Sequence, residues 1–296
     1  MLEGIFVEGL LYGIMALGVF ITFRVLDFPD LSVDGTFPLG AAVMAVSVLA
    51  GMPFFISYPL VFLAGALAGS ITAFIHIKLK VPHLLAGILT MTMLWSINIR
   101  VLGGRANLPL LRMHTSLDRV KEMLSPYVRE EVALLLFFLV LLALLKFLLD
   151  LFFHTDLGLA LGALGNNEQM VVAVGENPHT LKIIGVSFSN GLVALSGGLA
   201  AQYQGFADVN LGQGIIISGL ASVMLGEFLI RSNRISMIIL RVILGSVLFR
   251  AIMFLARYHG YYIGLTPNDL KLIAGLLIIT SIVVSQVRTT RYASVK

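Results

Sequence analysis

The chain has 296 residues, of which 58% are hydrophobic and only 12% are charged. A soluble domain averages about 25% charged residues because its surface faces water, so this composition excludes an ordinary soluble protein. The net charge of +4 comes from scattered Lys and Arg, which excludes nucleic acid as a partner, and the absence of cysteine excludes disulfides and thiolate metal sites.

Apolar runs begin almost at the first residue. A helix needs about 20 mostly apolar residues to cross a membrane, and nine stretches are predicted to do so: 4–24, 35–50, 55–77, 83–102, 132–153, 181–202, 213–230, 235–256 and 270–287. No basic residue precedes the first run, which predicts a retained helix rather than a cleaved signal peptide. We expect an all-α polytopic membrane protein with a single transmembrane domain over 1–296.

Small residues recur within these predicted spans, where they suit close packing of helices. They are Gly65, Gly69, Ser196, Gly197, Gly198, Gly219 and Gly226. Helices in lipid associate through close approach of their backbones. We therefore interpret these residues as packing positions rather than as a binding site.

Basic residues in short loops predict which ends of the spans face the cytoplasm. Arg24, Lys78, the turn 231–234 and the C-terminal tail fall on one side, so we place them in the cytoplasm and the N-terminus outside. The loop 103–131 is then external, although it holds five basic residues. Its segment 116–129 is predicted to form a short amphipathic helix near the membrane surface.

Two segments of opposite predicted orientation resemble each other. Residues 28–41 and 206–219 each read Phe-x-Asp-aliphatic and then Gly-x4-Gly, with one extra residue in the second copy. This pattern predicts an inverted repeat, a common construction in transporters. The first repeat would cover about 4–102 and the second about 181–287.

Both segments place polar residues where Pro, Gly or Asn break the helices. The candidate pathway and helix-break residues are Asp30, Asp34, Gly35, Asp208, Asn210 and Gly214. Unwound backbone at membrane depth is tolerated only where it is buried in protein or lines a cavity. Each carboxylate is expected near the membrane interface, where it either caps the following helix or lines a translocation pathway.

The loop 154–180, between the fifth and sixth predicted spans, is too polar and interrupted to cross the membrane. Asn166 or Asn167 is predicted to cap a short helix over 168–174, and Gly175 to end it.

This short helix is expected to have one apolar face. Glu168 lies in its first turn, and Met170, Val171 and Val174 are expected on the apolar face. An exposed amphipathic helix either docks into a groove of a partner protein or rests on lipid headgroups. The residues alone leave both alternatives open.

At this loop the sequence becomes similar to a known family. The pattern Gly-Leu-Ala-Leu…Gly-x-Asn…Gly over 158–175 resembles the coupling-helix loop of ABC permeases of the branched-chain amino acid and ribose type. The runs 192–208, 26–35 and 84–92 resemble a branch of that superfamily in which some members are linked to tryptophan or tyrosine uptake. The resemblance covers nearly the whole chain.

The resemblance implies an ATP-driven importer of a small organic solute in the bacterial inner membrane, with an aromatic amino acid favoured. It implies a homodimeric permease, cytoplasmic ATP-binding cassette subunits and an external solute-binding lipoprotein. Residues 166–175 would form the coupling helix. Gly162 stands where relatives usually carry Arg, and Asn166 where Asp is common, which predicts a weaker or differently arranged ATPase contact.

The sequence contains no motif for catalysis. It lacks a Gly-x4-Gly-Lys-[Ser/Thr] phosphate loop, a His-Glu-x2-His zinc pair and a Gly-x-Ser-x-Gly elbow. We expect no catalytic residue, metal site or cofactor, and ATP hydrolysis in a separate subunit.

Ionisable residues within spans are predicted to pair along their helices, namely Glu227 with Arg231 and Lys146 with Asp150. Arg241 and Arg250 are expected to extend toward opposite membrane surfaces.

An ion-coupled secondary transporter is the alternative to the ATP-driven importer. It would need a coupling-ion site of carboxylates and unwound carbonyls near the middle of the membrane. Asp30, Asp34 and Asp208 are the candidates for such a site. An intramembrane enzyme would need a facing nucleophile and base, and the sequence indicates no such pair.

Overall fold

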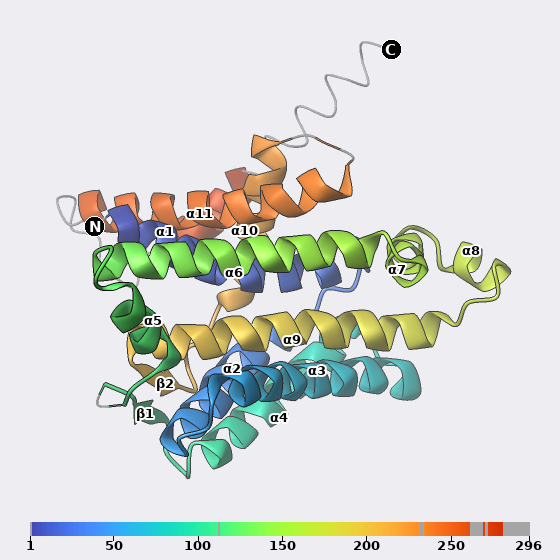
Figure 1. Cartoon of the computed structure of the whole chain (residues 1–296). Helices are drawn as coiled ribbons and strands as arrows, with labels where there is room; N and C mark the ends of the chain where they lie inside the picture. The colour runs from blue at the N-terminus through green and yellow to red at the C-terminus, as the bar shows by residue number, and fades with distance from the viewer. Residues whose placement is uncertain are drawn as a thin grey trace.

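The computed structural model describes residues 2–111, 113–230, 232, 234–260, 269 and 272–280. The long helices lie roughly side by side (Figure 1). In chain order the elements are α1 (Leu2–Phe20), the π-helical turn η1 (Ile21–Val25), α2 (Val33–Leu49), α3 (Phe54–Leu79), α4 (His83–Val101), β1 (Asn107–Pro109), α5 (Ser116–Leu124), α6 (Glu130–Phe153), α7 (Asp156–Asn166), α8 (Glu168–Ala173), α9 (Pro178–Gln204), β2 (Phe206–Asp208), α10 (Ile215–Leu229) and α11 (Ile235–Gly260). Residues 272–280 are also helical.

Within the described residues, six helices are long and apolar enough to cross a membrane: α1 with η1, α3, α4, α6, α9 and α11. The predicted spans 35–50 and 213–230 correspond to α2 and α10, which have only 17 and 15 residues and measure about 25 and 22 Å. A full crossing takes about 30 Å, so the structure does not confirm these two as full-length spans. Half of the ninth predicted span, 270–287, lies outside the described residues, and its part 272–280 is helical.

Two groups of short elements lie at opposite ends of the long helices (Figure 1): α7 and α8 at one end, and α5, β1 and β2 at the other. β1 and β2 pair antiparallel, with Asn107 opposite Asp208, a small ribbon that the all-α expectation missed. α5 covers the first part of the amphipathic helix predicted over 116–129. It begins with a capping box in which Thr115 and Asp118 exchange hydrogen bonds.

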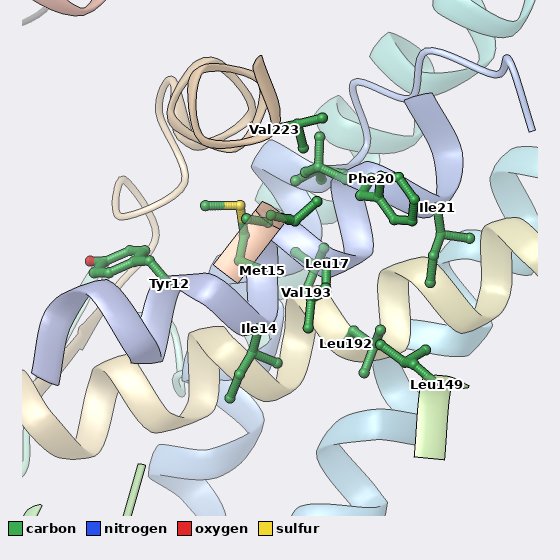
Figure 2. Packing of buried hydrophobic residues seen from close by; sticks show 14 of the residues in the cluster. Tyr12, Ile14, Met15, Leu17, Phe20, Ile21, Leu149, Leu192, Val193 and Val223 are labelled. Atoms are coloured by element: carbon green, nitrogen blue, oxygen red, sulfur yellow. The ribbon is translucent and has the colours of Figure 1, made fainter. Parts of the chain in front are cut away.

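α1 and α9 form the centre of the molecule. In the most apolar 18-residue stretch of each span, 78% of the residues are buried for α1 with η1 and 72% for α9. The corresponding fraction is only 28–33% in the other four long spans. α1 packs against α6, α9, α10 and α11, whereas α9 packs against α1, α2 and α3. Figure 2 shows Leu17 of α1 beside Val193 of α9 in this core. The surrounding helices expose many apolar side chains, as expected for surfaces that face lipid.

Glycines allow the central helices to approach closely. A Cβ on Gly65 of α3 would lie 2.4 Å from the Cβ of Ala194 in α9. A Cβ on Gly197 of α9 would lie 1.9 Å from the carbonyl oxygen of Phe37 in α2. Because these spaces are too small for any side chain, the prediction that these two glycines are packing positions is confirmed.

The charged side chains of α10 and α11 bind across helices. Glu227 of α10 binds Arg24 of η1 (Oε1 to Nε, 2.7 Å) and Arg241 of α11 (Oε1 to Nη2, 3.2 Å). Arg231, the predicted partner of Glu227, lies outside the described residues. The expectation that Arg241 extends to the membrane surface is wrong, because its side chain is only 12% exposed and pairs with Glu227.

Two further predictions concern charged side chains in the long helices. The predicted pair of Lys146 and Asp150 in α6 is confirmed. Arg250 of α11 does not extend freely to the membrane surface: its guanidinium lies 3.5 Å from the centre of the Tyr12 ring, and Nη1 lies 3.8 Å from Glu8 Oε2. The first pair therefore connects two turns of α6, and the second connects α11 to α1.

Candidate functional site

The two short helices, α2 and α10, meet at their N-terminal ends. The carboxylate of Asp34, in the first turn of α2, accepts hydrogen bonds from the backbone N–H groups of Gly214 (3.0 Å) and Ile216 (2.9 Å) at the start of α10. A carboxylate suits this position because the first N–H groups of a helix lack intrahelical acceptors and carry partial positive charge. Asp34 therefore caps a helix from the distant second half of the chain rather than the helix that follows it.

The meeting point lies midway along the long helices. Asn190 and Ala194, in the central third of α9, contact Asp30 in the loop before α2 and Gly40 in the middle of α2. From there α2 runs toward β2, whereas α10 runs toward η1 at the opposite end. Asp34 therefore lies away from both ends of the long helices, whereas Asp30 lies beside Gly87 in the second turn of α4.

Asp30 anchors the loop before α2 and is only 1% exposed. Its carboxylate accepts hydrogen bonds from the backbone N–H of Ser32 (2.8 Å), the Ser32 hydroxyl (2.8 Å) and Asn190 Nδ2 (2.7 Å). These bonds offset the cost of burying a polar group. Gly87 of α4 gives the loop room, since a Cβ there would lie 2.7 Å from the Leu31 nitrogen.

Asp208, in β2, lies at the end of the molecule that carries β1. Its carboxylate accepts hydrogen bonds from the backbone N–H of Asn210 (2.7 Å) and from Asn107 Nδ2 (3.0 Å). The bond to the residue two positions on is the same local turn that Asp30 makes with Ser32. The exposed Asn210 shapes this turn, and Gly214, with a φ of 79°, lets the chain enter α10.

A cavity of about 310 Å³ lies beside the meeting point of α2 and α10. This volume is within the range of small-molecule sites, about 300–1,000 Å³. The cavity is lined by Asp34, Gly35 and Gly214 from the predicted set, and by Trp95 and Asn98 of α4. Sequence reasoning missed the last two, although Trp95 is the only tryptophan and Asn98 is an isolated amide in an apolar helix.

At the opposite end of the molecule from β1 and β2, the loop 154–180 folds into α7 and α8 (Figure 1). Asn167 rather than Asn166 caps α8: its Oδ1 accepts hydrogen bonds from the N–H groups of Gln169 (3.0 Å) and Met170 (3.2 Å). Asn166 instead ends α7.

Two further residues define the C-terminal end of α8 and attach its first turn to α9. Gly175 follows α8 with a φ of 90°, which favours glycine. Glu168 Oε2 binds Lys182 Nζ at 2.9 Å and so connects α8 to the first turns of α9. Glu168 therefore attaches the N-terminal end of this six-residue helix to α9, and Gly175 follows its C-terminal end.

The apolar residues of α8 do not share one exposed face as expected. Met170 and Val174 are 58% and 75% exposed, whereas Val171 is only 3% exposed. The prediction is therefore wrong for Val171, which packs into the core and attaches α8 to the rest of the protein. Val172 is also exposed, at 55%. Of the predicted apolar residues, Met170 and Val174, which directly follows the helix, are exposed, and we call this pair the α8 patch.

α7 connects this loop to the centre of the molecule. A Cβ on Gly165 would lie 2.1 Å from the carbonyl oxygen of Val25, so α7 rests directly on the backbone of η1. A second cavity of about 340 Å³ separates Asn167 and Lys182 from Phe28, in the loop that leads to Asp30. The α8 patch and the central meeting point are thus connected through α7 and η1.

The groups at these two places can bind and orient a solute or a partner. Within the described ranges, no group of three or more His, Cys, Asp or Glu side chains is placed to hold a metal ion. The central cavity offers carboxylate and amide oxygens beside an indole side chain, and the α8 patch offers apolar surface.

Replacement of Asp34 by Ala should destabilise the central meeting point. The change leaves the N–H groups of Gly214 and Ile216 without their acceptor, at a cost of roughly 2 to 4 kcal/mol. We expect a clear drop in the apparent unfolding temperature, followed by the fluorescence of Trp95. Asp34→Asn keeps one acceptor oxygen and should lose about half as much. An unchanged unfolding temperature for Asp34→Ala would contradict the capping role.

Comparison with known proteins agrees with this architecture. The family described as "Branched-chain amino acid transport system / permease component" matches residues 1–282. The chain is 39% identical to the tyrosine transport system permease protein of Clostridioides difficile over 272 residues, which cover 92% of this chain and 87% of the relative. It is 28% identical to the ribose import permease RbsC of Haemophilus influenzae over 198 residues, 67% of this chain and 59% of the relative.

A solved structure shares the fold. PsaBC from Streptococcus pneumoniae, in complex with a Fab, aligns with 95% of this chain and 88% of its own, with a TM-score of 0.50 and 17% identity. Together with the apolar helices, the match over residues 1–282 assigns a transport role and a multi-pass position in the membrane. The chain belongs to the branched-chain amino acid transport system permease family of ABC transporters.

Proposed function

We propose that this chain is the membrane-spanning subunit of an ATP-driven importer for a small organic solute, with an aromatic amino acid favoured. The observation that supports this most is the α8 patch, in which Met170 and Val174 expose apolar surface on a capped and ion-paired helix. Such a helix suits a groove on a separate cytoplasmic ATPase. The alternative position on lipid headgroups suits it less, because α8 lies on an extension beyond α6 and α9 (Figure 1).

A movement of α8 would be transmitted to the central cavity through contacts between neighbouring helices. A shift of α8 carries α7, and α7 pushes on η1 where Gly165 meets Val25. η1 holds the end of α10 through Arg24 and Glu227, and the start of α10 is held by Asp34. ATP-driven motion at the α8 patch would therefore tilt α10 against α2 and open or close the central cavity.

An inverted repeat of α1–α3 and α9–α11 is supported by the arrangement of these helices. In each set a long helix is followed by an acidic turn, a short helix and a helix of 26 residues. Each first helix packs on the other set: α1 on α10 and α11, and α9 on α2 and α3. The two short helices run from the centre toward opposite ends, as repeats of opposite orientation require.

The remaining parts of the assembly follow from the family. We expect a homodimer of this chain, two ATP-binding cassette subunits in the cytoplasm and an external solute-binding lipoprotein, in a bacterial inner membrane. The name of the Clostridioides difficile relative, a tyrosine transport system permease, favours tyrosine or a similar amino acid as the solute. The solute-binding protein would supply most of the affinity.

The test is reconstitution of the chain in proteoliposomes with a candidate ATP-binding cassette subunit and a candidate solute-binding protein. We expect co-purification of permease and ATPase, vanadate-sensitive ATP hydrolysis, and tyrosine uptake that requires all components. Uptake by the permease alone, driven by a Na⁺ or H⁺ gradient, would contradict the proposal.

One observation favours the alternative of an ion-coupled transporter. Helices that begin at central depth beside a carboxylate, as α2 and α10 do at Asp34, also form the ion sites of secondary transporters. The same proteoliposomes without ATPase decide between the two mechanisms. Gradient-driven uptake that is lost in Asp34→Asn would support the alternative.

A further inference from the structure

The central cavity contains a buried hydrogen-bond acceptor that no described residue satisfies. Asn98 is 0% exposed, and its Nδ2 donates to the carbonyl oxygen of Gly35 at 3.1 Å. Because a carbonyl can only accept, this bond fixes which end of the amide is the oxygen. No donor among the described residues reaches Asn98 Oδ1, although Asn98 lines the cavity. An unsatisfied buried acceptor in a native fold requires an explanation.

The cavity wall holds a second acceptor, the carboxylate of Asp34. The helix N-termini at this point offer few free N–H groups, because those of Gly214 and Ile216 donate to Asp34, and that of Ile215 donates to Gly212. In the first turn of α2, the N–H groups of residues 34–36 donate to carbonyls of residues 31 and 32. An anion would therefore find few free backbone N–H groups, whereas a ligand with N–H groups would find the Asn98 oxygen and the Asp34 carboxylate.

Trp95 gives the same cavity an aromatic wall. Its side chain lines the cavity from α4 and is half exposed. The face of an indole ring attracts cations and packs against apolar groups. A cavity of about 310 Å³ has room for one small solute of this kind.

We propose that this cavity is a subsite for a protonated amine: Asn98 and Asp34 accept hydrogen bonds from the ammonium group of the solute, and Trp95 covers its apolar body. The inference rests on the proposed function for the view that the bound solute is the one transported. It adds which end of the solute the permease recognises. A free carboxylate is not required for binding.

The single tryptophan allows a direct test on the intact permease in nanodiscs. Trp95 fluorescence, excited at 300 nm, is titrated with tyramine, L-tyrosine and 3-(4-hydroxyphenyl)propionate. We expect saturable changes with tyramine and tyrosine, and binding of the acid that is at least about tenfold weaker, because a site built to accept hydrogen bonds rejects an analogue without the donor. Equal responses to amine and acid, or no response to any of the three compounds, would overturn the subsite.

Two variants test whether tyramine binding depends on Asn98. Asn98→Leu, checked for folding by its unfolding temperature, should weaken tyramine binding at least about tenfold. Thr92→Val, at a lining residue whose hydroxyl already donates to the Leu89 carbonyl, should leave it unchanged. If Asn98→Leu fails to fold, the discrimination between amine and acid by the unmodified chain still decides the question.

The experiments distinguish a failure of the proposed subsite from a failure of the proposed importer function. If the reconstituted complex takes up tyrosine while Trp95 responds equally to amine and acid, the subsite is wrong and the importer stands. If tyramine binds saturably and the acid does not, while no ATPase supports uptake, the subsite stands and the proposed function is wrong.

Discussion

Replacement of Gly40 by Ala should severely destabilise the protein. A Cβ at this position would lie 1.9 Å from the carbonyl oxygen and 2.5 Å from the carbonyl carbon of Ala194 in α9. Both are backbone atoms, so α2 and α9 would have to separate along their contact. Forcing extra atoms into a packed core costs about 1–3 kcal/mol and occasionally more, and we expect the upper end because no flexible side chain can give way.

Gly162 provides the matched control for this prediction. It also lies within a helix, α7, but a Cβ there would have no neighbour within 4 Å. Gly162→Ala should therefore stabilise its helix by up to about 1 kcal/mol. Thermal unfolding in detergent compares the two variants, and similar unfolding temperatures would contradict the close α2–α9 contact.

Replacement of Met170 or Val174 by Asp should uncouple transport from ATP hydrolysis. Both side chains are exposed, at 58% and 75%, so a carboxylate is solvated in the free permease and the fold is unaffected. In the docked state the same carboxylate would be buried against apolar surface without a partner. We expect uptake in the reconstituted complex to fall at least about tenfold, which corresponds to 1.4 kcal/mol of lost docking energy.

Two further variants separate docking from folding. Met170→Leu keeps the α8 patch apolar and should retain full uptake. Val171→Asp places a charge at a residue that is 3% exposed and should instead lower the unfolding temperature. Normal uptake in both Met170→Asp and Val174→Asp would show that the α8 patch contacts no ATPase.

Local patterns in the sequence predicted much of the fold. Long apolar runs predicted the six long helices, because a lipid-facing helix must be apolar over its whole length. Capping chemistry also acts locally. For that reason the short helix after α7, its asparagine cap and its terminal Gly175 were predictable to within one residue.

Features that depend on distant contacts were not predictable in the same way. The apolar character of α2 and α10 indicated spans, yet their start at central depth depends on Asp34 meeting Gly214, 180 residues further along the chain. Val171 was expected to be exposed because the helical pattern alone does not say which side packs on the protein. Asn98 lacks a motif, and its role depends on the cavity that α2 and α10 create.

The central claim is that α8 lies in the cytoplasm and docks on an ATPase. Because the natural chain has no cysteine, Val174→Cys gives a single labelling site for a membrane-impermeant maleimide. We expect labelling in inside-out vesicles and not in intact spheroplasts, with protection when the ATPase subunit is bound. Labelling in intact spheroplasts, or equal labelling with and without the ATPase, would contradict the account.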